Sequence, residues 1–259
     1  MKTVAMTYAG RTVELPDLPE YQKFYRKLAA GTWEPRTFDV LARNLDRDTV
    51  YIDIGSWIGV TPLWASQSAR KVVAVEPDPK CVEILRALVP AYRNVTLLEG
   101  ALSTEETVKL HAADAFGSSE TSILAISRGP EASASGLTMR SILSQAGEGP
   151  VFVKVDVEGY EYLLGDELAA LRGFPLKGAQ IAVHPQLYER TLKGGFMRRR
   201  LITLWRTWLL SRLFHGMLPA PTLAKYSSVT KYLFSGVLFR KIPKGADFVF
   251  ERRFPERSE

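Results

Sequence analysis

The stretch VYIDIGSWIG, residues 50–59, decides how this chain is expected to fold. Strand-forming residues lead into two glycines, Gly55 and Gly59, four positions apart. Glycine lets the backbone turn sharply and lets a ligand approach the main chain, so a strand, a glycine turn and a helix start in quick succession are typical of a nucleotide-binding α/β unit. On its own, this spacing also fits an ordinary tight turn between a strand and a helix.

Strand and helix patterns alternate on both sides of this stretch. Strands that are apolar on both faces are predicted at 50–54, 71–76, 94–100, 151–157 and 178–184, and helices at 60–69, 77–89 and 161–173. Such alternation indicates a parallel sheet covered by helices on both sides. The predicted fold class is therefore α/β, with a Rossmann-like sheet. In the less regular part, 107–112 and 121–127 are strand-like around a polar loop, and 136–147 suggest a strand end and a short helix.

The two ends of the chain extend this unit. Residues 1–48 are predicted to form an N-terminal helical cap, and residues 49–259 the Rossmann-like domain, with a basic helical insertion at 193–230. After the insertion, 231–242 and 246–254 resemble two antiparallel strands. The Pro-Lys-Gly between them favours a β-hairpin.

Composition limits the class of protein. The 259 residues suit one large domain, and 46% hydrophobic residues are enough for a substantial core. The single cysteine, Cys81, excludes a disulfide and a thiolate zinc site within the chain and favours a cytoplasmic setting. No apolar run is long enough for a signal peptide or a membrane span. The net charge of +6 does not choose among nucleic acid, lipid and acidic substrates.

A carboxylate at the end of the second strand completes the binding pattern. Glu76 lies 21 residues after Gly55, where an acid can accept both hydroxyls of a ribose. The third glycine of the dinucleotide motif is missing, and Asp53 would repel a pyrophosphate but attract a cation. We therefore expect S-adenosylmethionine, which carries an ammonium and a sulfonium group, rather than NAD. A nucleotide-dependent oxidoreductase is the alternative.

The run VFVKVDVEGYE, residues 151–161, places charges at the end of another buried strand. Lys154, Asp156 and Glu158 alternate, so they share one face of an extended chain. Charged groups are seldom buried without partners, so packing alone does not explain them. An ion pair between Lys154 and either acid is the structural alternative.

His184 ends the next core strand at the same edge of the sheet. Methyl transfer to a hydroxyl needs a general base, and Asp156, Glu158 and His184 are the candidates. The same three side chains could instead hold a divalent ion such as Mg²⁺ or Mn²⁺, although no metal is assigned. The predicted catalytic residues are Asp156, Glu158, His184 and Lys154.

Three motifs together resemble a known family. DIGSWIG at 53–59, EPDP at 76–79 and KVDVEGYE at 154–161 are similar to the FkbM family of S-adenosylmethionine-dependent methyltransferases, over about residues 33–185. Ser56 and Trp57 depart from the family pattern, which usually has Ala or Cys and then Asn. The resemblance implies a class I methyltransferase sheet and O-methylation of a hydroxyl on a small-molecule, glycan or lipid-type acceptor.

The resemblance also assigns binding positions. The end of the third strand, with Glu99, Ala101 and Leu102, should lie beside the adenine. The loop at 116–122 should face the acceptor through Ser118, Ser119 and Glu120. The predicted cofactor-binding residues are Asp53, Gly55, Ser56, Gly59, Glu76, Pro77, Glu99, Ala101 and Asp156.

Residues 193–212 hold six basic side chains and no acid. At helical spacing, one stripe of this segment is apolar; it contains Leu201, Ile202, Trp205, Trp208, Leu209 and Leu213. Tryptophans flanked by arginines suit peripheral contact with the inner membrane face through 196–214. A helix covering the sheet and a lid over the acceptor are the alternatives, and a non-catalytic membrane-associated module is a third functional hypothesis. Without a recognised module, nucleic acid is not expected.

Overall fold

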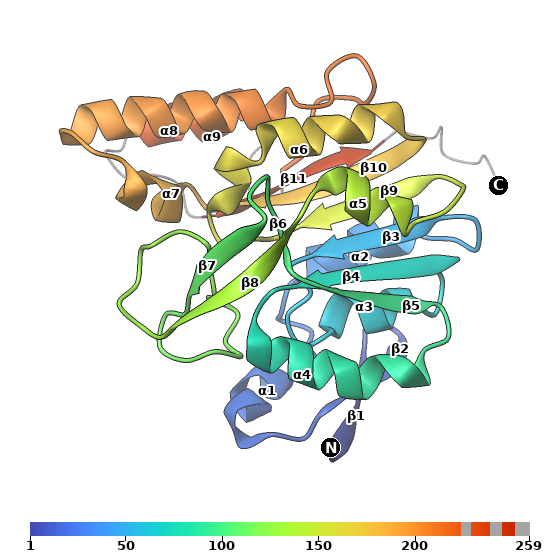
Figure 1. Cartoon of the computed structure of the whole chain (residues 1–259). Helices are drawn as coiled ribbons and strands as arrows, with labels where there is room; N and C mark the ends of the chain where they lie inside the picture. Colours follow the sequence, from blue (N-terminus) through green and yellow to red (C-terminus); the bar gives the residue numbers. More distant parts are fainter. Residues whose placement is uncertain (224–228, 239–244, 252–259) are drawn as a thin grey trace.

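A six-stranded sheet forms the centre of the computed structural model, which describes residues 1–223, 229–238 and 245–251 (Figure 1). Its strands lie in the order β11-β10-β9-β3-β4-β5. Five are parallel: β3 (Val50–Ile54), β4 (Lys71–Glu76), β5 (Val95–Glu99), β9 (Val151–Val155) and β10 (Leu176–Val183). Numbered along the chain, these run 3-2-1-4-5, the order of a doubly wound sheet. The predicted Rossmann-like fold class is confirmed.

Both faces of the sheet are covered. Every residue of β3 and β9 is buried, and neighbouring side chains point to opposite faces. Ile52 belongs to a cluster with side chains of α5 (Met139–Ser144) and α6 (Gly165–Ala169). Tyr51 belongs to the opposite cluster, with side chains of α2 (Pro35–Asn44), α3 (Val60–Ala65) and α4 (Pro79–Leu88). A sheet held from both sides fixes the positions of its strand ends.

The N-terminal segment packs on this sheet. It contains the hairpin β1 (Thr3–Tyr8) and β2 (Arg11–Pro16), a 3-10 helix (Pro19–Tyr21) and α1 (Gln22–Ala29), followed by α2. Tyr8 and Leu15 share the cluster of Tyr51, and the Tyr8 hydroxyl donates to the carbonyl of Val60 at 2.6 Å. The segment 1–48 thus contributes to the core that covers one face of the sheet.

A smaller sheet has the order β6-β8-β7, formed by β6 (Ala101–Leu102), β8 (Glu131–Leu137) and β7 (Thr107–His111). The strand predicted at 107–112 is present. The strand predicted at 121–127 is wrong, because this stretch bends and pairs only through a bridge from Ser122 to His111. The Ser122 hydroxyl accepts the backbone N–H of Leu124 at 3.1 Å, which favours the bend over an extended chain.

The helix predicted at 161–173 is divided into shorter pieces. A 3-10 helix (Tyr160–Leu163), α6 and a second 3-10 helix (Ala170–Gly173) follow one another. Gly165 lies at the break, where glycine weakens a continuous helix.

The C-terminal part differs from its prediction. It contains α7 (Pro185–Thr191), α8 (Phe196–Ser211), α9 (Val229–Leu238) and β11 (Ala246–Glu251). The predicted β-hairpin is wrong: 229–238 is helical, and β11 pairs antiparallel with β10. Tyr232 of α9 packs edge-on against Phe248 of β11, at 6.1 Å between ring centroids. The rest of the predicted hairpin, 239–244 and 252–254, lies outside the described residues. None of the described helices has the length and apolarity needed to cross a membrane.

Candidate functional site

The site lies where the strand order reverses, between β3 and β9, which is where doubly wound sheets bind ligands. The loop after β3 approaches the end of β9 closely. Gly55 has a φ of +87°, and a Cβ at this position would lie 1.9 Å from the carbonyl oxygen of Asp156. Only glycine fits here, because a side chain would be both strained and blocked by backbone.

A cavity of about 580 Å³ opens beside this loop. We call it the Glu76 cavity. Its walls are the ends of β3, β4 and β9, the segment at β6, and the loop after β7. The residues lining it include Gly55, Trp57, Glu76, Pro77, Ala101, Leu102, Leu110, Ser118, Ser119, Asp156 and Glu158.

Glu76 is held in place by backbone groups. One carboxylate oxygen accepts the N–H of Asp78 at 2.8 Å, and the other accepts the N–H of Trp57 at 2.7 Å. Burial raises the pKa of Glu76 to about 8, although these two hydrogen bonds act in the opposite direction. A carboxylate has about four acceptor positions, so Glu76 retains capacity toward the cavity.

The loop after β7 is fastened to α4 by Asp78. One oxygen of Asp78 caps α4 by accepting the N–H groups of Lys80 and Cys81. Its other oxygen accepts the N–H of Gly117 at 2.9 Å and the hydroxyl of Thr121 at 2.6 Å. Both halves of the carboxylate are therefore used, and the loop that carries Ser118 and Ser119 is held over the cavity.

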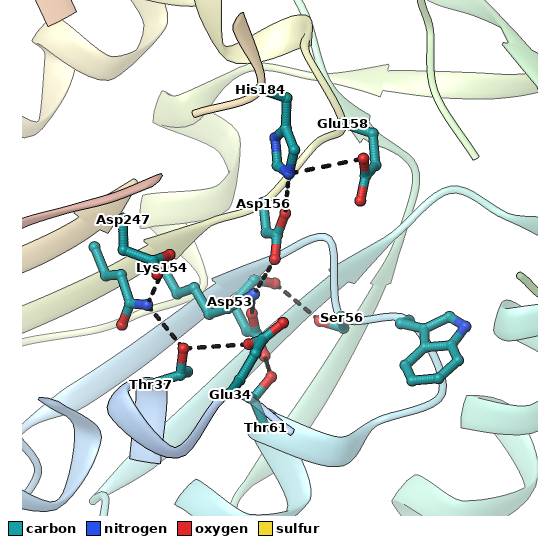
Figure 2. Close-up of polar contacts among 12 residues, drawn as sticks. Glu34, Thr37, Asp53, Ser56, Thr61, Lys154, Asp156, Glu158, His184 and Asp247 are labelled. Atoms are coloured by element: carbon teal, nitrogen blue, oxygen red, sulfur yellow. Dashed lines mark hydrogen bonds and ion pairs between the residues drawn. The ribbon is translucent and has the colours of Figure 1, made fainter. Parts of the chain in front are cut away.

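A second hollow lies next to the Glu76 cavity, and we call it the charged hollow. The charged groups that line it are Glu34, Lys154, Asp156 and Glu158. Figure 2 shows Lys154 between Asp53 and Asp156. The Nζ atom of Lys154 lies 3.0 Å from Oδ2 of Asp156 and 3.9 Å from Oδ1 of Asp53. The sequence left open whether Lys154 pairs with Asp156 or with Glu158, and in the structure it pairs with Asp156.

His184 faces three carboxylates. Its Nε2 lies 3.8 Å from Oδ1 of Asp156 and 3.7 Å from Oε2 of Glu158, and its Nδ1 lies 3.4 Å from Oε1 of Glu161 (Figure 2 shows the first two). Glu161 is fully buried and also accepts the backbone N–H groups of Gly159 and His184. Glu161 therefore fixes both the turn after β9 and the imidazole.

These surroundings give His184, Glu158 and Asp156 clearly different pKa values. Burial alone would lower the pKa of His184, but Glu161, Asp156 and Glu158 outweigh burial and raise it to about 10. Burial raises the pKa of Glu158 to about 7, and His184 partly offsets that effect. Asp156 is also desolvated, yet Lys154 and His184 hold its pKa below the usual value. Of these three groups, Glu158 is the one whose pKa lies near neutral pH.

Burial also affects two further groups. It raises the pKa of Glu34 to about 7, against the opposing effect of Lys154. Burial would lower the pKa of Lys154, but Asp156, Asp53 and Glu34 outweigh it and keep the ammonium charged. Carboxyl groups thus outnumber cations in this part of the site.

Most of the predicted site residues come together. Gly55, Glu76, Pro77, Ala101, Leu102, Ser118, Ser119, Asp156 and Glu158 line the Glu76 cavity, and Ser56 and Lys154 line the charged hollow. His184 joins them through its contacts to Asp156 and Glu158.

Besides His184, four predicted residues line neither space. Asp53 is fully buried, with the Thr61 hydroxyl donating to it. Gly59 has a φ of +92° at the start of α3 and faces Leu85, so it serves helix packing. Glu99 turns outward to an ion pair with Arg86. Glu120 is exposed, and its backbone N–H bonds the Ser118 hydroxyl at 3.3 Å.

Sequence reasoning gave no role to Glu34, Trp57, Asp78 or Glu161. Asp78 carries a readable signal, because Asp directly before Pro79 is typical of a helix start. Glu161 lies within the quoted run at 154–161. Glu34 gives no such signal: it reaches the site through a left-handed turn, φ +40°, before α2.

Asp156, Glu158 and His184 also form a potential metal-ligand set. One ligand atom from each lies within 4.8 Å of the other two. Carboxylate and imidazole ligands suit several divalent ions, and Glu161 would orient the imidazole from behind.

Comparisons with known proteins give distant matches. No protein-family model and no curated protein matches the chain, so the resemblance to the FkbM family stays a prediction. A putative methyltransferase from Streptococcus mutans in complex with SAH is 12% identical, with a TM-score of 0.45, covering 83% of this chain and 96% of that one. A fibrillarin pre-rRNA processing protein from Methanococcus jannaschii is 12% identical, with a TM-score of 0.44, covering 98% and 84%. A putative methyltransferase from Escherichia coli is 13% identical, with a TM-score of 0.42, covering 98% and 100%. Activity must therefore be argued from the site.

Proposed function

We propose that this protein is an S-adenosylmethionine-dependent methyltransferase that methylates a hydroxyl group of a small-molecule, glycan or lipid-type acceptor. Glu76 would hold the ribose, and the segment from Ala101 to Leu102 would lie beside the adenine. The amino-acid end of the cofactor would extend toward the charged hollow at Ser56 and Lys154. When bound, the cofactor supplies an electrophilic methyl group.

One observation carries this proposal: the glycine loop has no free row of N–H groups for phosphates. The N–H groups of Gly55 and Ser56 donate to the carbonyl of Val75, at 3.0 and 3.2 Å. The N–H of Trp57 donates to Glu76, and that of Gly59 donates to the carbonyl of Ser56 at 3.0 Å. Dinucleotide sites use such N–H groups to bind a pyrophosphate. Their use within the loop argues against the oxidoreductase alternative.

The charge of the site supports the same conclusion. Glu34, Glu76 and Glu158 all have raised pKa values, because burial disfavours their ionised forms. A cationic ligand would favour ionisation of these groups, whereas an anionic one would add repulsion. Sulfonium and ammonium groups match this site, and a pyrophosphate does not.

Glu158 is the group we assign as general base. Its carboxylate would accept the proton of the acceptor hydroxyl as that oxygen becomes bonded to carbon. A base with a pKa near the working pH serves best, and Glu158 has one near 7. His184 is protonated at neutral pH and cannot accept a proton, so it acts as a positioning residue for Asp156 and Glu158. Opposite pKa shifts in neighbouring carboxyls favour such a division of roles.

Calorimetry tests the cofactor assignment. We expect the wild type to bind S-adenosylmethionine and its demethylated product, and not NAD. Glu76→Gln should weaken cofactor binding about 10- to 100-fold, because a charge-assisted hydrogen bond to the ribose is lost. Glu99→Gln is the matched control, since Glu99 ends the neighbouring strand but lies outside the cavity.

Three outcomes would contradict the proposal. NAD binding without S-adenosylmethionine binding would support an oxidoreductase. An equal loss in Glu99→Gln would show that Glu76 has no special role. Binding of neither cofactor would leave a non-catalytic module with this fold.

A further inference from the structure

Helix α8 (Phe196–Ser211) buries polar side chains and exposes large apolar ones, the reverse of an ordinary surface helix. Its buried face carries hydroxyls and a charge. The buried residues are Arg200, Thr203, Leu204, Thr207, Leu210 and Ser211. Its exposed face carries large apolar side chains. A surface helix normally has the reverse arrangement, with the apolar stripe toward the core.

The polar contacts of the buried face fix this orientation. The Thr207 hydroxyl lies 3.1 Å from the hydroxyl of Tyr162, which follows the turn after β9. Arg200 forms an ion pair with Glu189 of α7, at 3.3 Å between Nε and Oε2. Turning the helix to bury its apolar stripe would break these contacts and leave buried polar groups unsatisfied, which is costly. The apolar side chains are therefore held outward.

Exposed apolar surface is concentrated on this part of the molecule. Among the described residues, seven of the nine exposed large hydrophobic side chains belong to α8 or α9: Phe196, Met197, Leu201, Trp205, Trp208, Leu209 and Phe234. We call these seven the apolar face. Trp205 is 57% exposed, and its ring stacks on Trp208 at 4.9 Å between centroids. Leu201, Trp205, Trp208 and Phe234 also line a shallow groove between the two helices. A concentration of this kind marks a surface that meets a partner.

The segment that carries most of the apolar face, 193–212, has charges of one sign. Arg198, Arg206 and Arg212 are exposed on α8 or at its end, and residues 193–212 contain no acid. The Arg212 guanidinium lies 5.7 Å from the centre of a Trp208 ring. Tryptophan at the boundary between water and hydrocarbon, with arginine beside it, is typical of helices that lie in a membrane surface.

We propose that the apolar face docks on a lipid surface that carries anionic headgroups. The tryptophans would enter the boundary of the acyl chains, and the arginines would pair with headgroup phosphates. A protein partner of ordinary composition has no comparable need for a segment, 193–212, that contains basic residues and no acid. The proposal does not depend on methyl transfer. It would place the candidate functional site near a lipid surface, because α7 connects His184 to α8.

Vesicle sedimentation tests this proposal with the full chain. We expect binding to vesicles of phosphatidylcholine with phosphatidylglycerol, and much weaker binding to phosphatidylcholine alone. The double variant Trp205→Ala/Trp208→Ala should reduce binding about tenfold or more, because two aromatic side chains no longer leave water. Arg198→Glu/Arg206→Glu should reduce it about tenfold as well, and only on anionic vesicles.

The matched control is Arg47→Glu/Arg140→Glu, which makes the same change of charge at exposed arginines outside α8. We expect this control to bind as the wild type does. Equal loss in the control would reduce the effect to net charge and overturn the proposal. So would absence of wild-type binding to anionic vesicles. If the wild type does not bind anionic vesicles, light scattering shows whether it is a dimer. A dimer that becomes monomeric in the variant Trp205→Ala/Trp208→Ala would assign the apolar face to a second copy of this chain. Cofactor calorimetry on the same samples tests the methyltransferase assignment separately.

Discussion

At the scale of single residues, the site is built by giving neighbouring carboxyls different partners. Asp156 has Lys154 at 3.0 Å, so it remains ionised. Glu158 reaches no lysine and has His184 at 3.7 Å, so burial dominates and its pKa rises to about 7. Glu158 also has a φ of +48°, a costly backbone conformation for a residue other than glycine. This strain, held in place by the Glu161 hydrogen bond to Gly159, directs the carboxyl into the cavity.

The pH profile of kcat/KM distinguishes Glu158 from His184 as the general base. For the wild type we expect activity to rise with pH through about 7, as Glu158 loses its proton. In His184→Gln the imidazolium that favours ionised Glu158 is gone, so the rising limb should move to higher pH. Glu158→Gln should lose a factor of about 10² to 10⁴ in kcat and retain cofactor affinity. If His184 were the base, His184→Gln would instead abolish the limb.

At the scale of elements, Asp78 links helix α4 to the loop over the cavity. The substitution Asp78→Asn keeps one oxygen for the helix cap but replaces the other with an amide NH₂, which cannot accept from Gly117 or Thr121. We expect stability to fall by about 1–3 kcal/mol and cofactor affinity to fall as well, since the loop that carries Ser118 loses its anchor. Urea unfolding and calorimetry measure the two effects.

A second helix cap provides the control for this prediction. Thr138 caps α5 by accepting the N–H of Ser141 at 3.2 Å, away from the cavity lining. Thr138→Ala should cost about 1 kcal/mol of stability and leave cofactor binding unchanged. Equal losses of affinity in both variants would mean that the loop is not anchored through Asp78.

The sequence pattern was sufficient to predict the central sheet, because short apolar runs alternate there with segments of helical spacing. The buried strands at 50–54 and 151–157 are apolar on both faces, and they define the sheet and the position of its ligand edge. Apolar runs without a clear period were ambiguous, which is why a strand was predicted at 231–242, where residues 231–238 belong to a helix. Of the stripe predicted for α8, Leu201, Trp205, Trp208 and Leu209 share the exposed face, whereas Ile202 packs against the core and Leu213 is buried in it. Whether that stripe faces the core or solvent depends on partners such as Tyr162 and Glu189, which no local pattern reveals.

Predictions of site residues depended on similar distinctions. Gly55 and Glu76 line the cavity because their positions follow from strand ends, which the pattern fixes. Glu99 also ends a strand, but Arg86 on α4 holds it outward. Asp53 lies one residue too early in β3 to emerge from the sheet, and the Thr61 hydroxyl binds it there. Only tertiary contacts separate these cases.

At the scale of the whole molecule, the buried carboxyls of the site weaken the fold, and the proposed cationic ligand would offset this cost. Glu76 has a pKa of about 8 in the folded state and an ordinary value near 4.3 when unfolded. Between these two pH values the unfolded chain gives up its proton while the folded one retains it, so the contribution of Glu76 to stability falls as pH rises. Glu34 and Glu158 act in the same direction.

The comparison of Glu76→Gln with the wild type tests this cost. In the absence of cofactor we expect the melting temperature of the variant to rise by several degrees relative to that of the wild type between about pH 4 and pH 8, because glutamine has no charge to bury. Glutamine also leaves one of the two backbone N–H groups without its acceptor, which lowers the melting temperature of the variant about equally at both pH values. Saturating S-adenosylmethionine should raise the melting temperature of the wild type near pH 8 by more than that of the variant, because the variant binds the cofactor about 10- to 100-fold more weakly. Scanning calorimetry at both pH values measures the difference. A difference in melting temperature between variant and wild type that is the same at about pH 4 and pH 8 would show that ionised Glu76 is compensated within the protein and needs no positively charged ligand.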